Sequence, residues 1–250
     1  MDSFNQNNFK ANLHDTNFSR IGIITLSTDF TIEQDFRKIC HMLPVDIFVN
    51  RIPFENPLNH ENYLKMADHL AEITNNILPG TQIDSIAYGC TSGTVAIGDK
   101  RITDEIQKSK AGAYVSTPIT AALKALKNLQ FKKIAVLTPY PKQVNKTIFD
   151  FLTKSNIEIV SFSSFNLEYD SEIASVDPKF LIETINKVKH KDADAVFISC
   201  TALRAVEVLD QIEKQISKHV ISSNQAMIWD CLRSVNINNS VSGYGALFSH

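Results

Sequence analysis

One pattern occurs twice in this sequence: a short apolar run ends in Cys-Thr and leads into a stretch that can form a helix. The first copy spans 83–98 (IDSIAYGCTSGTVAIG) and ends its apolar run at Cys90, and the second spans 193–205 (ADAVFISCTALRA) and ends its run at Cys200. An apolar run that passes directly into a helix is typical of a buried strand in a parallel sheet. Both cysteines are therefore expected at the carboxyl ends of buried strands.

Other landmarks recur at a similar distance along the chain. The apolar run 21–26 (IGIITL) is matched by 133–138 (KIAVLT), and the segment that begins at Val115 is matched by the one that begins at Ile221. The spacings all fall in a range of roughly 106 to 113 residues, which indicates an internal duplication. The sequence thus predicts an α/β fold of two pseudo-symmetric lobes, each with a parallel sheet flanked by helices, and an active site in the cleft between them.

Apolar periodicity, prolines and glycines divide the chain into elements and lobes. Residues 1–18 are polar and rich in Asn, and we expect a flexible tail. We predict a first lobe from 19–117 together with 225–250, and a second lobe from 118–224. Besides the two cysteine-bearing runs, strands are expected at 21–26, 45–49, 113–115, 133–138, 157–162 and 219–221. Helices are expected at 31–42, 59–77, 94–107, 118–128, 142–154, 178–189, 204–214 and 224–235.

Charge and hydropathy restrict the class of protein. The 250 residues carry a formal net charge of -2, and Lys and Arg are scattered, so there is no basic patch for nucleic acid. No apolar run is long enough to span a bilayer, and the N-terminal segment lacks the apolar centre of a signal peptide. We expect a cytoplasmic protein with no nucleic-acid or membrane partner.

The cysteines and histidines give no sign of a disulfide framework or a metal site. The 4 cysteines lie far apart without a Cys-x-x-Cys motif, and the 7 histidines show no metal-ligand spacing. Cys40 and Cys231 fall within helical patterns and are expected in the core. We predict neither a metal nor another cofactor.

The position of the repeated cysteines suggests a chemistry. Cys90 precedes a helix, where free N–H groups and the helix dipole favour a thiolate and bind carboxylates. If the lobes face each other, Cys90 and Cys200 flank one small molecule, and one sulfur can remove a proton while the other delivers one. Backbone N–H groups with Thr91, Ser92 and Thr201 would hold a substrate carboxylate. The alternative for each cysteine is an unreactive core position.

The motifs resemble the aspartate/glutamate racemase superfamily. The resemblance rests on the paired Cys-Thr strand ends, on Leu-Thr-Pro-Tyr at 137–140, and on Ser-Thr-Asp-Phe-Thr-Ile-Glu-Gln-Asp from Ser27, and it spans about 21–233. Within this superfamily the chain is similar to the maleate cis-trans isomerase and arylmalonate decarboxylase branch, and there to its ectoine-utilisation subgroup.

The resemblance implies that Cys90 and Cys200 are the catalytic cysteines and that Tyr140 contacts the substrate. Tyr140 stands between two prolines and has the alternative of only closing a turn. In the isomerases one cysteine adds to an alkene carbon, the central bond rotates and the thiolate leaves. In the racemases the two cysteines exchange a proton at an α-carbon. The decarboxylases keep only the second cysteine, so Cys90 argues against decarboxylation.

Two acidic residues depart from the isomerase pattern. Asp29 stands where maleate isomerases have an asparagine, and Asp170, with Asn166 as the alternative, stands at the position of a second asparagine. An ionised carboxylate only accepts hydrogen bonds and repels a substrate carboxylate, so it favours an ammonium or another N–H donor. We therefore favour a racemase or epimerase of an amino-acid-like substrate over a maleate cis-trans isomerase. Asp29 has the alternative role of a helix cap.

Two other classes of function are left open. A non-catalytic protein that binds a small ligand would keep the cleft with unreactive thiols, and a redox sensor would join Cys90 to Cys200 in a disulfide. In every case the expected partner is a small carboxylate or an amino-acid-like molecule. We also expect a homodimer, because exposed faces of two-lobed enzymes often pair.

Overall fold

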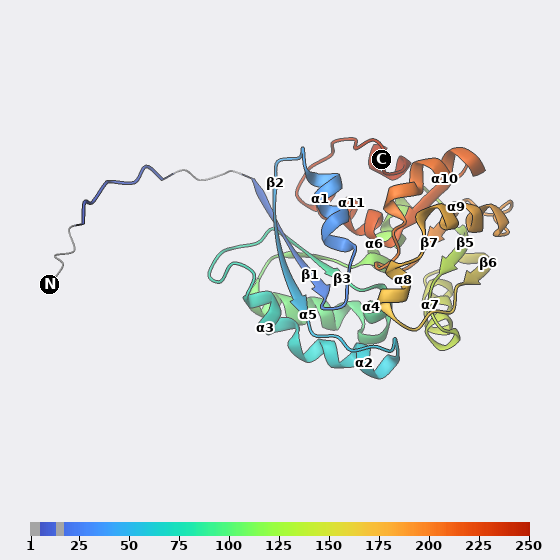
Figure 1. Ribbon diagram of the computed structural model, residues 1–250, viewed down its shortest axis with the longest axis horizontal. Coiled ribbons are helices and arrows are strands. Elements are labelled where there is room, and N and C mark those ends of the chain that lie inside the picture. The colour runs from blue at the N-terminus through green and yellow to red at the C-terminus, as the bar shows by residue number, and fades with distance from the viewer. Residues whose placement is uncertain (1–5, 14–17) are drawn as a thin grey trace.

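The computed structural model describes residues 6–13 and 18–250 of the chain. Two four-stranded sheets with only parallel neighbours form its centre, and helices surround both of them (Figure 1). The predicted α/β fold with two similar lobes is therefore confirmed.

The first sheet and the elements around it come from the first half of the chain. Its strands are β1 (Ser19–Leu26), β2 (Val45–Ile52), β3 (Ser85–Gly89) and β4 (Tyr114–Ser116). The helices are α1 (Ile32–Cys40), α2 (His60–Lys65), η1 (Met66–His69), α3 (Leu70–Asn75), α4 (Thr91–Ile97), α5 (Asp99–Ser109) and α6 (Pro118–Asn128).

The second sheet and its helices follow. Its strands are β5 (Lys133–Thr138), β6 (Glu158–Ser164), β7 (Ala195–Ile198) and β8 (His219–Ser222). The helices are α7 (Lys142–Lys154), α8 (Asp170–Ala174), α9 (Pro178–Lys187), η2 (Val206–Val208), α10 (Leu209–Ile216), α11 (Ser223–Ser234) and η3 (Ala246–Ser249).

The two sheets have the same strand order when the strands of each are counted from its own first strand. The order is β2-β1-β3-β4 in the first sheet and β6-β5-β7-β8 in the second. The two cysteine-bearing runs form β3 and β7, the third strand of each sheet. The duplication inferred from sequence spacing is therefore also a duplication of topology.

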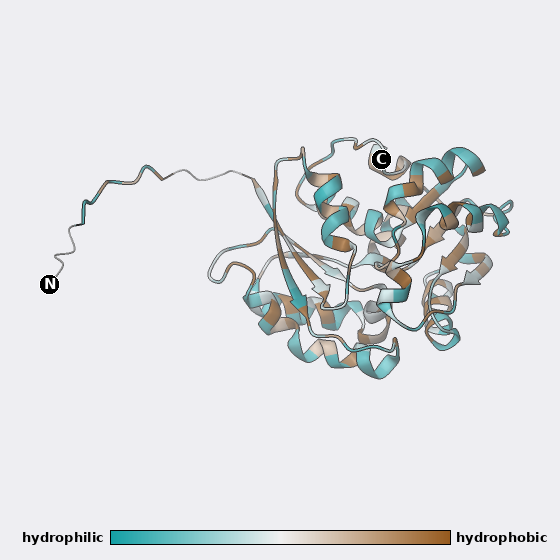
Figure 2. Cartoon of the chain, viewed as in Figure 1, coloured by the Kyte–Doolittle hydropathy of each residue, from teal (hydrophilic) through white to brown (hydrophobic). Residues whose placement is uncertain are grey.

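The inner strands are apolar over most of their length because helices cover both faces of each sheet. Ile21, Ile23 and Ile24 of β1 and Ile134 of β5 have no exposed surface, whereas the edge strands β2 and β6 are largely half-buried. Figure 2 shows the same division, with hydrophobic strands inside and hydrophilic outer faces on the helices.

Three expected helices differ from the structure. The segment 94–107 is divided into α4 and α5 at Gly98, whose φ of 93° is a backbone conformation that favours glycine. The segment 59–77 is divided into α2, a 3-10 turn and α3. The helix expected from 204 begins only with η2 and α10, because residues 201–205 after Cys200 form turns and irregular backbone.

Helix α11 contacts both sheets. It packs against β3 and β4 of the first sheet, against β8 of the second, and against α6. The predicted division of the chain between the lobes stays a prediction. Of the predicted tail 1–18, residues 1–5 and 14–17 lie outside the described residues, and Phe9 and Leu13 in the described part are 91% exposed.

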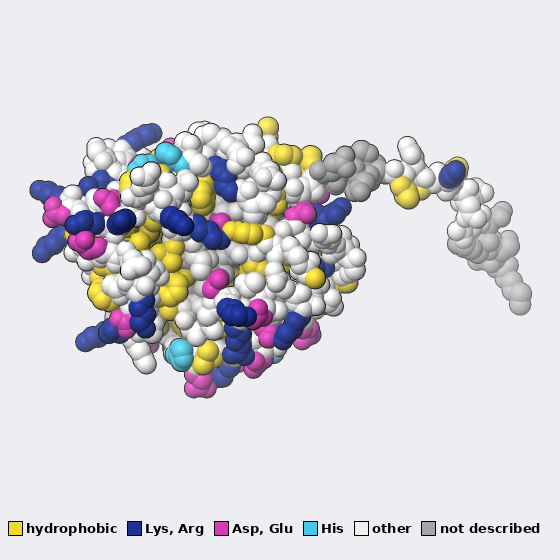
Figure 3. Space-filling model, turned by 180° about the vertical axis from the view of Figure 1, so that it is seen from behind, with side chains coloured by type: hydrophobic (Ala, Val, Ile, Leu, Met, Phe, Trp, Pro, Cys, Tyr) yellow, Lys and Arg dark blue, Asp and Glu magenta, His cyan; other side chains and the backbone are white. Residues whose placement is uncertain are grey.

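The surface carries charges of both signs. In the view of Figure 3, Lys and Arg side chains lie among Asp and Glu side chains across the visible face. Among the described residues, no helix has the length and apolar character that crossing a membrane requires.

Candidate active site

Cys90 and Cys200 follow the carboxyl ends of β3 and β7, at the place where the lobes meet. The chain segments that hold them contact each other directly. The Thr201 hydroxyl donates a hydrogen bond to the Gly89 carbonyl oxygen at 3.4 Å, and the Thr31 hydroxyl donates one to the Thr201 carbonyl oxygen. The charge that Cys90 would carry as a thiolate raises the pKa of Cys200, so the two sulfurs share one electrostatic environment. The structure thus brings the two predicted cysteines together.

Cys90 caps the start of α4 with its own side chain. Its Sγ accepts a hydrogen bond from the Gly93 N–H at 3.2 Å and lies 4.0 Å from the Ser92 hydroxyl. A Cβ at Gly93 would lie 2.7 Å from this sulfur, so the helix can approach the thiol only because residue 93 is glycine.

Burial acts on the Cys90 thiol in the direction opposite to the helix start. Cys90 is 3% exposed, and burial raises the pKa of its thiol to about 12. The Gly93 N–H acts in the opposite direction but is outweighed, because removing a thiolate from water costs more than one hydrogen bond returns.

Cys200 lies in a turn and not at the start of a helix. Its φ is 122°, a value that residues with a Cβ rarely adopt. The Ala202 N–H donates to Cys200 Sγ at 3.4 Å, and the Cys200 N–H donates to the Ser223 hydroxyl at 3.0 Å. Burial raises the pKa of this thiol strongly as well.

Two tyrosines complete the surroundings of the thiols. The Tyr140 hydroxyl is hydrogen-bonded to the Cys200 thiol, and burial holds the pKa of this phenol well above its ordinary value. Tyr63 is buried beside Ser92, near both cysteines, but its hydroxyl makes no hydrogen bond of ordinary geometry. The raised pKa favours the neutral form of both phenols, and the Tyr63 hydroxyl is the one left to donate to a ligand.

Asp29 is a helix cap at the edge of the site. One carboxylate oxygen accepts the backbone N–H groups of Thr31 and Ile32, each at 2.9 Å, and Asp29 is 5% exposed. Burial raises its pKa, opposed by these hydrogen bonds and by the charge of Arg51. Arg51 itself donates to the Asp29 carbonyl oxygen at 2.9 Å and pairs with Glu33, so it braces this loop.

Asp170, at the start of α8, is the second acidic residue of the site, and the alternative Asn166 is exposed. The Thr28 hydroxyl donates to its carboxylate at 2.5 Å. Burial raises the pKa of Asp170 to about 6, and the charge of Asp29 adds to this effect. Its own charge raises the pKa of both thiols, so Asp170 belongs to the same buried group.

The three hydroxyl residues predicted to hold a carboxylate have different partners. Thr91 donates to the Ser223 hydroxyl at 3.0 Å, and Thr201 donates to the Gly89 carbonyl oxygen. Ser92 instead faces a cavity between the lobes. Of the three, Ser92 is thus the hydroxyl best placed for a ligand.

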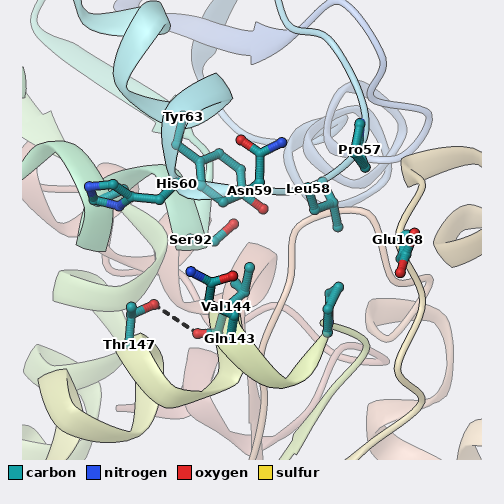
Figure 4. Close-up of a pocket in the computed structure, with 12 residues that line it drawn as sticks. Pro57, Leu58, Asn59, His60, Tyr63, Ser92, Gln143, Val144, Thr147 and Glu168 are labelled. Carbon is teal, nitrogen blue, oxygen red and sulfur yellow. Dashed lines mark hydrogen bonds between the residues drawn. The ribbon is translucent and has the colours of Figure 1, made fainter.

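The cavity has a volume of about 490 Å³ and lies between α2 and α4 on one side and α7 on the other. Figure 4 shows Tyr63 and Ser92 facing Gln143, Val144 and Thr147 across it. The remaining lining residues are Pro57, Leu58, Asn59, His60, Ala96, Pro141 and Glu168. Tyr63 and Ser92 therefore border both the cavity and the region of the thiols.

Sequence reasoning missed Tyr63. Its place in α2 follows the apolar period of Leu64, Ala67 and Leu70, which is the signal of an ordinary core residue. The only feature of the sequence that could have indicated a role in the site was a phenol at a core position of a helix that borders the predicted cleft. Within 6–13 and 18–250, no three or more His, Cys, Asp or Glu side chains are grouped so that they could hold a metal ion.

Known proteins share both the sequence pattern and the fold. A maleate isomerase from Geobacillus stearothermophilus is 24% identical over 245 residues, which cover 92% of this chain and 97% of that protein. A maleate isomerase from Pseudomonas putida, solved with maleate, superposes with a TM-score of 0.86 at 21% identity, over 93% of this chain and 98% of that one.

A third relative carries a reaction intermediate. A serine variant of the maleate cis-trans isomerase from Nocardia farcinica, solved with a covalently bound succinylcysteine intermediate, has a TM-score of 0.85 at 16% identity, over 93% of this chain and 98% of that one. These structural likenesses establish the fold.

The family assignment rests on a sequence match. The family model described as arylmalonate decarboxylase matches residues 83–248, which is more than half of the chain and contains both cysteines. The resemblance to the ectoine-utilisation subgroup stays a prediction, and the resemblance to the maleate isomerase and arylmalonate decarboxylase branch is confirmed: the chain belongs to the arylmalonate decarboxylase family, and it shares its fold with the maleate isomerases.

Proposed function

We propose that this protein is a cofactor-independent cis-trans isomerase of a small unsaturated carboxylic acid, with maleate as the model substrate. The observation that carries the proposal is the meeting of two thiols, Cys90 and Cys200, in one buried site at the junction of the lobes. A decarboxylase that works with one cysteine has no use for the sulfur of Cys90. The full-length similarity to maleate isomerases supports the same choice.

The proposed reaction uses one thiol as nucleophile and the other as proton donor. The sulfur of the first thiol forms a bond to an alkene carbon, and the π electrons move to the neighbouring carbon, which takes a proton from the second thiol. The proton that the first thiol gives up passes to the second sulfur, which is then a thiol again. The former double bond is now single and can rotate. The second sulfur then takes a proton from the carbon and returns its own proton to the first sulfur as the carbon–sulfur bond breaks and the double bond forms again in the trans arrangement.

The neutral resting thiols suit this sequence. Burial raises the pKa of both cysteines and so favours the neutral thiol at each of them. Addition of S–H across the double bond then needs no outside proton. Tyr140 lies against the Cys200 thiol, where it can stabilise the sulfur when negative charge develops on it. Ser92 and Tyr63 are placed to donate to a substrate carboxylate.

The decisive experiment is incubation of the purified protein with maleate, followed by proton NMR for fumarate. Cys90→Ser and Cys200→Ser should each lower turnover at least about a thousandfold, since each removes a reacting group. Cys40→Ser and Cys231→Ser are the matched controls, because both cysteines are buried in the core and lie in α1 and α11. The controls should keep turnover if the protein remains folded.

Other outcomes would lead to other conclusions. If no small acid is turned over and both site variants bind maleate as the wild type does, the protein is a ligand-binding member of the family. If Cys90 and Cys200 form a disulfide under mild oxidation and maleate is inert, the redox-sensor interpretation replaces isomerisation.

A second candidate, an amino-acid racemase or epimerase, is favoured by the buried carboxylates of Asp29 and Asp170. Two ionised carboxylates beside the thiols would attract an ammonium group and repel a second substrate carboxylate. The test is incubation with amino acids in D2O, with deuterium at the α-carbon read by mass spectrometry. Exchange there without conversion of maleate would establish the racemase over the isomerase.

A further inference from the structure

The first two residues of α11 contact the turn that carries Cys200. Ser223 and Asn224 have 0% and 2% of their surface exposed, and both point their polar groups at this turn. The Ser223 hydroxyl accepts the Cys200 N–H at 3.0 Å. The Asn224 amide donates to the carbonyl oxygen of Thr201 at 2.8 Å. The start of α11 thus binds the backbone N–H of Cys200 and the backbone carbonyl oxygen of Thr201.

The turn needs such support. Cys200 has a φ of 122°, a region that is essentially reserved for glycine because a Cβ meets the backbone there. A residue keeps this conformation only where the surroundings hold it, and the hydrogen bond to Ser223 fixes the N–H that would turn away if the backbone relaxed.

The same serine also reaches the other cysteine. Thr91, the residue after Cys90, donates its hydroxyl hydrogen bond to the Ser223 hydroxyl at 3.0 Å. A single buried oxygen therefore joins the main chain of Cys200 to the side chain next to Cys90. The two segments lie in different sheets and are otherwise linked by Thr201 and Gly89 at the longer distance of 3.4 Å.

We propose that Ser223 is a positioning residue that sets the place of the Cys200 sulfur relative to Cys90 by bridging their two segments. The inference rests on the proposed function, in which these two thiols react with one substrate. A two-thiol reaction requires both sulfurs at fixed places on opposite sides of the substrate, and small displacements reduce turnover severely. Ser223 does not line the cavity, and it acts through its hydrogen bonds to the Cys200 backbone and to the Thr91 side chain.

The test compares Ser223→Ala with Ser222→Ala. Both changes remove one hydroxyl from a buried serine at the start of α11, but the Ser222 hydroxyl accepts from the Gln225 N–H at 3.2 Å and caps the helix. Both variants should lower the melting temperature. Only Ser223→Ala should also lower kcat for maleate, at least tenfold, while KM changes less than twofold, because the substrate contacts are intact and the sulfur is displaced.

Thiol reactivity gives a second readout that needs no substrate. Iodoacetamide labelling, followed at each cysteine by peptide mass spectrometry, should be at least fivefold faster at Cys200 in Ser223→Ala, because the released turn relaxes and exposes the sulfur. In Ser222→Ala the labelling rate should stay within twofold of the wild type. Equal labelling rates at Cys200 and equal kcat in the two serine variants would overturn the proposal that Ser223 positions the Cys200 sulfur. Inert maleate with faster labelling in Ser223→Ala would overturn only the proposed reaction.

A second set of variants applies if Ser223→Ala does not fold. Thr91→Val keeps the size of the side chain and removes only the donor to Ser223, whereas Thr91→Ser keeps the hydroxyl. The bridge predicts faster Cys200 labelling in Thr91→Val and a wild-type rate in Thr91→Ser. The same rate in both variants contradicts it.

Discussion

The hydroxyl of Thr28 donates a hydrogen bond of 2.5 Å to the carboxylate of Asp170, across 142 positions of sequence. The bond joins the loop after β1 to the start of α8, and so ties the two lobes together on the side of the thiols. Asp170 is one of the two acidic residues that depart from the isomerase pattern, and this hydrogen bond holds its carboxylate in place. We expect the charge state of this carboxyl group to influence which substrates the site accepts.

Asp170→Asn should improve the binding of a dicarboxylate. An ionised Asp170 repels maleate, whereas an amide can donate to it, so KM for maleate at pH 8 should fall about tenfold, or ~1.4 kcal/mol. Since burial raises the pKa of Asp170 to about 6, the wild-type carboxyl becomes neutral below that pH, and the ratio of the two KM values should approach one near pH 5.

Comparing the two proteins at each pH removes the titration of maleate itself. Asp177→Asn, which changes an exposed cap of α9, is the control and should leave KM unchanged. A KM that rises in Asp170→Asn for every dicarboxylate, and also for amino acids, would mean that the carboxyl group binds the substrate as an acceptor.

Tyr63→Phe should change binding without loss of stability. The Tyr63 hydroxyl makes no hydrogen bond of ordinary geometry and lies beside Ser92 at the cavity, so its removal should leave the melting temperature almost unchanged. If this hydroxyl donates to the substrate carboxylate, KM should rise about tenfold, or ~1.4 kcal/mol. Tyr140→Phe provides the contrast, because its hydroxyl contacts the Cys200 thiol, and it should lower kcat by about a hundredfold. Identical kinetic effects of the two changes would argue against these separate roles.

Gly93→Ala should displace the Cys90 sulfur. The added Cβ would lie 2.7 Å from Sγ of Cys90 and 2.7 Å from Cε of Met66, so both atoms have to move away or the start of α4 has to shift. Overpacking of this kind costs about 1–3 kcal/mol of stability. We expect kcat to fall at least tenfold in a folded protein. Gly22→Ala is the control, because the nearest atom, on Ile77, would be 3.4 Å from the new Cβ. Full activity of a folded Gly93→Ala would show that the position of Cys90 is not critical.

Asp35→Asn should stabilise the protein above neutral pH. Asp35 is buried in α1, and burial raises its pKa from 3.8 to about 7, opposed by a hydrogen bond from the Asn224 amide at 2.8 Å. The folded state therefore binds a proton that the unfolded chain releases, and stability falls as pH rises between these values. The variant avoids this loss, on the order of 2 kcal/mol at pH 8, and its advantage should vanish toward pH 4.

Urea unfolding at several pH values measures this difference. Asp194→Asn should have the opposite sign, because hydrogen bonds from the Lys132 and Lys133 N–H groups lower the pKa of Asp194. That carboxylate stabilises the fold above its ordinary pKa, and the contribution is lost as pH falls. If Asp35→Asn unfolds at a lower urea concentration than the wild type at pH 8, the hydrogen bond from Asn224 and the charge of Lys38 stabilise the Asp35 carboxylate by more than burial destabilises it.

The strands, the duplication and the places of Cys90 and Cys200 could be predicted because their signals are local. Apolar runs, a glycine or serine before Cys-Thr, and recurrence at one spacing are all visible in the sequence. The protonation of the thiols could not be predicted in the same way. A helix start lowers the pKa of a thiol. Burial depends on how both lobes pack together, and it raises the pKa of Cys90 by more than the helix start lowers it.

The contacts that α11 makes with the turn of Cys200 could not be predicted from the sequence either. Ser223 and Asn224 lie in an ordinary helical pattern, and their importance arises only where α11 meets the turn of Cys200. The sequence could not decide whether Asp29 caps a helix or binds the substrate, because both roles use the same carboxylate in the same loop. In the structure this carboxylate accepts the N–H groups of Thr31 and Ile32 at 2.9 Å and so caps the start of α1. Its contact with a substrate stays a prediction.

The raised pKa of the two buried thiols has a consequence for their oxidation. Peroxide attacks thiolates and hardly reacts with neutral thiols, so the empty enzyme should tolerate oxidants that inactivate ordinary cysteine enzymes. Oxidation of the cysteines should then occur mainly during turnover, when a sulfur briefly carries negative charge. The protein without substrate should therefore lose activity to peroxide more slowly than the protein during turnover.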